Sequence, residues 1–140
     1  MLFGLSVPSL LLIAIAVAVV WIYLPFLVVA YGRVQIGYSK EIMAAPRAAF
    51  DKLPDYAKRA TWAHQNALEA FPIFAAAALM AYVTNQTSEI AGWAAIVWIT
   101  ARFLFPVFYI LNIPTLRSLM FGIGSICSFT LIGLSLISTL

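Results

Sequence analysis

The chain has 140 residues, of which 64 % are hydrophobic and 9 % are charged. A soluble domain carries about 25 % charged residues on its surface, so this composition excludes an ordinary water-soluble fold. The net charge of +3 does not indicate nucleic-acid binding, because the basic residues are not clustered with aromatic ones. In a membrane protein, an excess of Lys and Arg instead reports the orientation of the chain.

Charged residues are absent from three long stretches of the chain, residues 1–32, 70–88 and 118–140. A fourth stretch, residues 90–116, contains only Arg102. A helix needs about 20 mostly apolar residues to cross the hydrocarbon core of a bilayer, and each stretch is long enough or nearly so. The sequence therefore predicts an all-α, integral membrane four-helix bundle.

The first predicted helix covers residues 8–31. It lacks the basic start of a secretory signal peptide and exceeds the usual length of its apolar core, so we expect it to be retained. The other helices are predicted at about residues 56–83, 89–112 and 115–138. The last two are separated at Pro114, because the residue before a proline disfavours the helical conformation.

The long polar loop, residues 32–55, carries most of the charged side chains and has room for a short interfacial helix at about residues 39–50. Arg117 follows the third predicted helix and falls on the same side, whereas residues 84–88 and both ends contain no Lys or Arg. Because Lys and Arg concentrate in cytoplasmic loops, we predict one multi-pass domain, residues 1–140, with both termini non-cytoplasmic. In a bacterium it would lie in the inner or plasma membrane.

Polar residues inside a spanning helix are costly and rarely face lipid. At 100° per residue, the second predicted helix carries a stripe about 80° wide, formed by Arg59, Trp62, Asn66, Glu69 and Ile73. On the third helix, Arg102 and Tyr109 lie two turns apart on one face. His64 falls on the other side of its helix and is expected to make contacts rather than catalyse.

Two interpretations of these residues stay open. In the first, Glu69 and Arg102 form a buried ion pair between two helices, and Asn66 hydrogen-bonds across them. In the second, they line a pocket for an anionic ligand, because a guanidinium can donate two parallel hydrogen bonds to a carboxylate. That pocket would include Arg59, Asn66, Glu69, Arg102, Tyr109 and Arg117. The spacing of His and Cys predicts no metal site, and Cys127 is expected to fill space.

Residues 59–72, RATWAHQNALEAFP, resemble the signature of the membrane-associated proteins in eicosanoid and glutathione metabolism, the MAPEG family, in its bacterial branch. The shared pattern is Arg-Ala, then Asn-x-x-Glu, then an aromatic residue and a proline. Arg102, Tyr109, Pro114 and Arg117 are similar to residues in the third and fourth helices of that family. The resemblance extends over essentially the whole chain.

This resemblance implies a homotrimer that binds glutathione between subunits and acts as a glutathione-dependent transferase or peroxidase on lipophilic electrophiles from the bilayer. It implies that the glutathione is held by Arg59, Asn66, Glu69, Arg102 and Tyr109, and that Arg117 stabilises the thiolate. Trp62 and Phe105 depart from the pattern, because catalytic members usually have Arg and Tyr there. A non-catalytic lipid-binding or scaffold protein of the same fold is therefore the alternative, unless Arg33, Lys58 or a neighbouring subunit replaces the missing arginine.

The predicted orientation is tested by labelling a cysteine that replaces Lys40 with a membrane-impermeant reagent. Because the polar loop is predicted to be cytoplasmic, Lys40→Cys should react only from the cytoplasmic side, and Thr87→Cys only from the opposite side. Labelling of Lys40→Cys exclusively from outside would reverse the topology.

Overall fold

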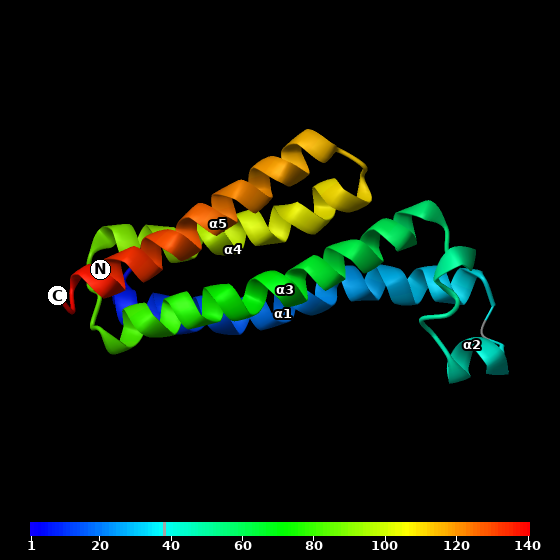
Figure 1. Ribbon diagram of the computed structural model, residues 1–140, viewed down its shortest axis with the longest axis horizontal. Coiled ribbons are helices and arrows are strands. Elements are labelled where there is room, and N and C mark those ends of the chain that lie inside the picture. Colours follow the sequence, from blue (N-terminus) through cyan, green and yellow to red (C-terminus); the bar gives the residue numbers. More distant parts are fainter. Residues whose placement is uncertain (38) are drawn as a thin grey trace.

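The computed structural model describes residues 1–37 and 39–140; Tyr38, part of the predicted polar loop, lies outside the described residues. The elements are α1 (Val7–Gln35), α2 (Lys40–Ala44), a 3₁₀ turn (Phe50–Lys52), α3 (Asp55–Val83), α4 (Glu89–Ile110) and α5 (Pro114–Ile137) (Figure 1). The helices α1, α3, α4 and α5 are each long and apolar enough to cross a membrane. This confirms the predicted all-α membrane bundle.

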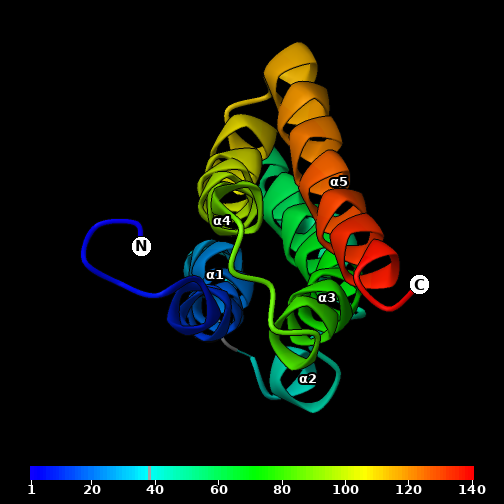
Figure 2. The same cartoon turned by 90° about the vertical axis from the view of Figure 1, so that its left-hand side faces the viewer.

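The bundle consists of two antiparallel pairs, α1 with α3 and α4 with α5 (Figure 1). The helices α3 and α4 each contact the other three spans, while α1 and α5 occupy opposite corners (Figure 2). Both termini and the α3–α4 turn lie at one end of the bundle, and the polar loop lies at the other. Toward the loop end the two pairs diverge, so that α3 and α4 separate there.

Small side chains hold the bundle together at the end that contains the termini. The buried alanines of α3 and α4 at this end are Ala77, Ala78, Ala81, Ala91, Ala94 and Ala95. Without a hydrophobic driving force between helices in lipid, close backbone approach through small residues is a main source of stability. At the inner edge of this region, the rings of Phe74 and Trp98 stack with centroids 3.7 Å apart.

Local sequence explains the bounds of α4. The hydroxyl of Ser88 accepts a hydrogen bond from the Ala91 N–H at 3.3 Å, as an N-cap serine does. After Ile110 the chain turns through Asn112, whose φ is 59°, a left-handed conformation that Asn tolerates better than most residues. Pro114 then begins α5, where its missing N–H has no intrahelical partner to lose.

The first helix ends later than predicted, at Gln35 rather than residue 31. Gly32 does not end α1, because it is the contact point between α1 and α3: a Cβ placed there would overlap the Cβ of Ala57. As a result Arg33 belongs to the last turn of α1 rather than to the loop. A cation in that position interacts favourably with the C-terminal carbonyls of the helix.

Replacing Gly32 with Ala should therefore destabilise the packing of α1 on α3. Ala57 is completely buried, so the added methyl group has no room, and overpacking of this kind costs about 1–3 kcal/mol. The measurement is the apparent midpoint of thermal unfolding in detergent, followed by circular dichroism. Gly133→Ala on α5, where nothing lies within 4 Å of the added Cβ, is the control; equal midpoints for the two variants would contradict this packing.

Candidate functional site

The buried polar centre of the bundle is a contact between α4 and α3. Arg102 is only 6 % exposed, and its Nη2 donates to the side-chain Oδ1 of Asn66 at 2.8 Å and to the backbone O at 3.3 Å. The guanidinium carbon lies 4.5 Å from the centre of the Phe105 ring. A charge within spanning helices needs polar partners, and one residue of α3 supplies two acceptors here.

The first of the two interpretations holds only in part: Asn66 accepts a hydrogen bond across the helices, but Glu69 and Arg102, both among the described residues, form no ion pair. Glu69 is exposed, and its Oε1 accepts a hydrogen bond from the Gln65 Nε2 at 3.4 Å. The reason is geometric: Asn66 lies one turn earlier on α3 and presents its backbone and side-chain oxygens to the same nitrogen of Arg102. The carboxylate of Glu69 therefore faces the neighbouring cavities instead of Arg102.

A groove of about 570 Å³ separates α3 from α4 and α5 at the height of this contact. We call it the α3–α5 groove. Its lining residues are Asn66, Glu69, Ala70, Ile73, Trp98, Arg102, Phe121, Gly124, Ser125, Ser128 and Phe129. Most of the lining surface is apolar, Ser125 and Ser128 add hydroxyl groups from α5, and the charged groups come from Glu69 and Arg102 alone. The groove thus has a long apolar wall and one polar region.

A shallower cavity of about 450 Å³, here called the Trp62 recess, lies nearer the loop end and is lined by Trp62, Gln65, Asn66, Glu69 and Tyr109. Asn66 and Glu69 line both the recess and the α3–α5 groove. The two cavities therefore share one wall on α3. A ligand that occupies both cavities would contact the polar atoms of Asn66 and Glu69 near its centre.

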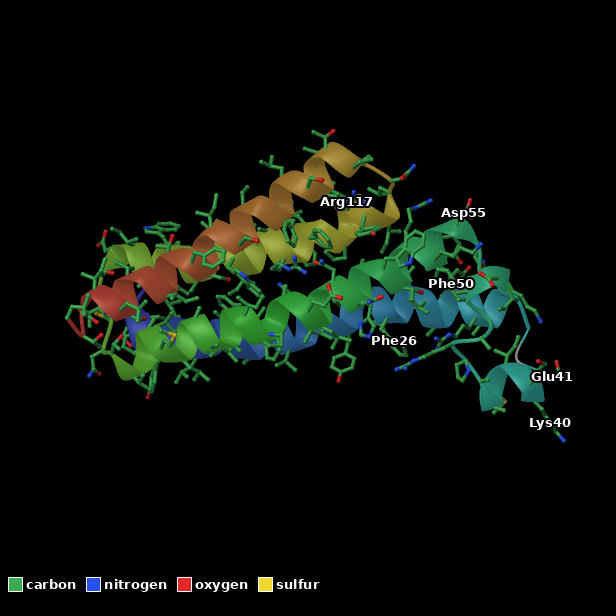
Figure 3. The ribbon with its side chains drawn as sticks, viewed as in Figure 1. Phe26, Lys40, Glu41, Phe50, Asp55 and Arg117 are labelled. Carbon is green, nitrogen blue, oxygen red and sulfur yellow. The ribbon has the colours of Figure 1, made fainter. Side chains whose placement is uncertain are left out.

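The remaining predicted residues lie at the loop end of the bundle: Arg59 on α3, Tyr109 on α4 and Arg117 on α5. The guanidinium carbon of Arg117 lies 4.6 Å from the centre of the Tyr109 ring, and Figure 3 shows Arg117 near the start of α5. Arg59 instead donates from Nε to the backbone O of Ile110 at 2.9 Å. Because Ile110 ends α4, this bond satisfies a carbonyl that has no partner within the helix.

A separate pocket of about 580 Å³ lies between α1, the polar loop and α3, in the region where Figure 3 labels Phe26 and Phe50. Arg33 and Arg47 line it, and the buried Nε of Arg33 has no hydrogen-bond partner among the described residues. Trp62 lines both this pocket and the Trp62 recess. Arg33 is thus on the far side of Trp62 from Tyr109.

Sequence periodicity anticipated much of this arrangement. The stripe predicted on α3 does face α4 and α5, and His64, on the other side, contacts α1, where its Nδ1 lies 2.7 Å from the backbone O of Ile22. Gln65 was missed, although its position four residues before Glu69 is a spacing that brings helical side chains together. Gly124 was also missed, because nothing in the sequence marks it as a neighbour of Arg102.

Together, four helices able to span a membrane and a largely apolar groove with one polar region between them define a multi-pass helical membrane protein with a candidate site between its helices. The model of the MAPEG family matches residues 10–137. The chain therefore belongs to the MAPEG family, whose members are membrane proteins associated with glutathione and eicosanoid metabolism. The match is to the family as a whole and assigns no branch. No curated protein and no solved structure matches the chain.

Replacing Asn66 with Ala should destabilise the fold, because it removes the side-chain acceptor of a buried guanidinium. Leaving such a donor short of a partner costs about 1–3 kcal/mol. The apparent unfolding midpoint in detergent measures the effect, with Gln65→Ala as the control because Gln65 is exposed on the same helix. A midpoint for Asn66→Ala no lower than that of the control would argue against the Arg102 contact.

Proposed function

We propose that this protein is a membrane-bound, glutathione-dependent transferase or peroxidase that acts on lipophilic electrophiles. The observation that carries the proposal is the α3–α5 groove, which is apolar along most of its wall and polar where Asn66, Glu69 and Arg102 line it. Binding sites of this kind combine apolar walls with a few polar groups that orient the ligand. Such a groove suits an apolar electrophile beside a polar thiol, and membership of the MAPEG family favours glutathione as that thiol.

We propose that Asn66, Glu69 and Tyr109 contact glutathione directly, because all three line the Trp62 recess. The carboxylate of Glu69 suits the ammonium group of the tripeptide. Arg59 acts differently: it holds the end of α4 through Ile110 and thereby places Tyr109.

We assign stabilisation of the glutathione thiolate to Arg117. It is the fourth residue of α5, and a cation near a helix N-terminus is unfavourable for the helix itself, which favours a functional reason for its position. A nearby guanidinium favours the thiolate over the thiol and so lowers the pKa of the ligand's sulfur. The N-terminus of α5 carries a partial positive charge, which also lowers the pKa of the thiol.

The chemistry requires no further protein nucleophile. With a halonitroarene, the thiol first gives its proton to water. The thiolate then forms a carbon–sulfur bond to the ring, and halide leaves. With a lipid hydroperoxide, the thiolate attacks the terminal oxygen, the O–O bond breaks, and the alkoxide takes a proton to become the alcohol. A second glutathione then converts the sulfenic acid to glutathione disulfide and water.

We also propose that the protein is a homotrimer with the polar loop in the cytoplasm. Gln65 and Glu69 are exposed on the spanning helix α3, and polar side chains in such helices are rarely left facing lipid. A neighbouring subunit would cover this surface. The basic loop supports the orientation, because Lys and Arg concentrate on the cytoplasmic side.

A non-catalytic lipid-binding or scaffold protein is the second candidate. The apolar wall of the groove, with Trp98, Phe121 and Phe129, suits an acyl chain, and Trp62 provides no charge for a carboxylate. Calorimetry on the detergent-solubilised protein separates the candidates: saturable heat with millimolar glutathione supports the enzyme, and its absence supports the lipid-binding protein.

Replacing Arg117 with Ala should lower kcat/KM for glutathione conjugation of a halonitroarene at pH 7 by about tenfold or more, because one charge partner shifts a pKa by about 1–3 units. Loss of the arginine raises the pKa of the bound thiol. The deficit should therefore be largest at neutral pH and shrink as the pH rises toward 9. Initial rates measured across this range give the profile.

Lys52→Ala is the control for this experiment, because it removes one exposed positive charge from the loop without touching Tyr109. Its pH profile should match that of the unchanged protein. If Arg117→Ala retains the full rate and an unshifted profile, Arg117 has no part in the mechanism.

A further inference from the structure

The Arg102 contact dictates which way the side-chain amide of Asn66 is turned. A guanidinium has donors and no acceptor, so the atom of Asn66 that faces Arg102 at 2.8 Å must be the oxygen. The amide nitrogen, Nδ2, therefore faces away from Arg102. None of the hydrogen bonds among the described residues uses this nitrogen, while Asn66 lines both the α3–α5 groove and the Trp62 recess.

The position of Arg102 in turn depends on a glycine of α5. A Cβ placed on Gly124 would lie 3.3 Å from the Cδ of Arg102 and 3.7 Å from the indole of Trp98. On the other side, Arg102 is held by Asn66 and by the Phe105 ring. The arginine arm thus passes through a gap that exists because residue 124 has no side chain.

We propose that Gly124 and Arg102 are positioning residues, which act through Asn66 to present its N–H donors to a carboxylate of the ligand. The proposal rests on the proposed function, because glutathione is the carboxylate-bearing ligand considered. It reassigns Arg102 from a direct contact of glutathione to a residue that orients another contact. It also gives a role to Gly124, which weakens the interior of a helix relative to alanine.

The alternative is that Arg102 and Asn66 only tie α4 to α3. The two roles differ in what Asn66→Asp should do. Aspartate keeps an oxygen for Arg102, so the tie remains, but it replaces the N–H donors with a second oxygen. We expect the unfolding midpoint to be retained and the Kd for glutathione to rise about tenfold, the loss expected when a hydrogen bond to a charged group is removed. Unchanged affinity would overturn the donor role.

The glycine is tested with a matched pair of variants in full-length protein in detergent. Gly124→Val pushes against Arg102, whereas at Gly122, two residues earlier on α5, nothing lies within 4 Å of an added Cβ. Because both variants place the same side chain in the same helix, their propensity effects cancel. We expect Gly124→Val to raise the Kd for glutathione about tenfold and Gly122→Val to leave it unchanged.

A double-variant cycle shows whether Gly124 acts through Asn66. If it does, the Asn66→Ala/Gly124→Val double variant binds glutathione no more weakly than Asn66→Ala alone, because residues in one network do not add. Additive losses, or equal effects of Gly124→Val and Gly122→Val, would overturn the inference.

A wrong proposed function can be distinguished from a wrong positioning role. If the unchanged protein binds no glutathione, the enzyme proposal falls, and thermal unfolding without ligand decides the positioning claim. Gly124→Val should lower the midpoint when Arg102 is present but not in the Arg102→Ala background, where the side chain it meets is gone. The same drop in both backgrounds would overturn the dependence of Arg102 on Gly124.

Discussion

A guanidinium enclosed by apolar helices is the constraint on which the candidate site depends. Arg102 is buried in a helix long and apolar enough to cross a membrane, and lipid cannot satisfy its donors. Asn66 meets this demand with two oxygens from one residue of α3. That bond joins α3 to α4, sets the direction of the Asn66 amide and leaves the carboxylate of Glu69 exposed to the cavities. The Arg102–Asn66 contact therefore determines which polar atoms line the groove.

The surrounding fold makes room for this contact by packing differently at its two ends. Buried alanines bring α3 and α4 close together near the termini, and the stacked rings of Phe74 and Trp98 mark where the close packing ends. Beyond them the helix pairs diverge, and the cavities occupy the widening space between α3, α4 and α5. The polar centre thereby lies beside the mostly apolar lining of this space.

The arginines of the predicted site have different partners and therefore different roles. Arg59 is bound to the end of α4, Arg102 to Asn66, and Arg117 lies over Tyr109. A sequence motif treats them as one cationic set, yet only Arg102 lines the α3–α5 groove. Within the MAPEG family, to which the chain belongs, this arrangement supports a site in which few cations touch the ligand and others hold the helices that carry it.

The sequence by itself determined the membrane environment, the number of spans and the face of α3 that carries Asn66 and Glu69, because charge-free length and helical periodicity are local properties. Only the tertiary structure decided that Arg102 pairs with Asn66 rather than Glu69, since a difference of one helical turn depends on how two helices are set against each other. It also decided that Gly124 lies against Arg102. A residue without a side chain leaves no pattern, and its effect arises solely from what packs into the space above it.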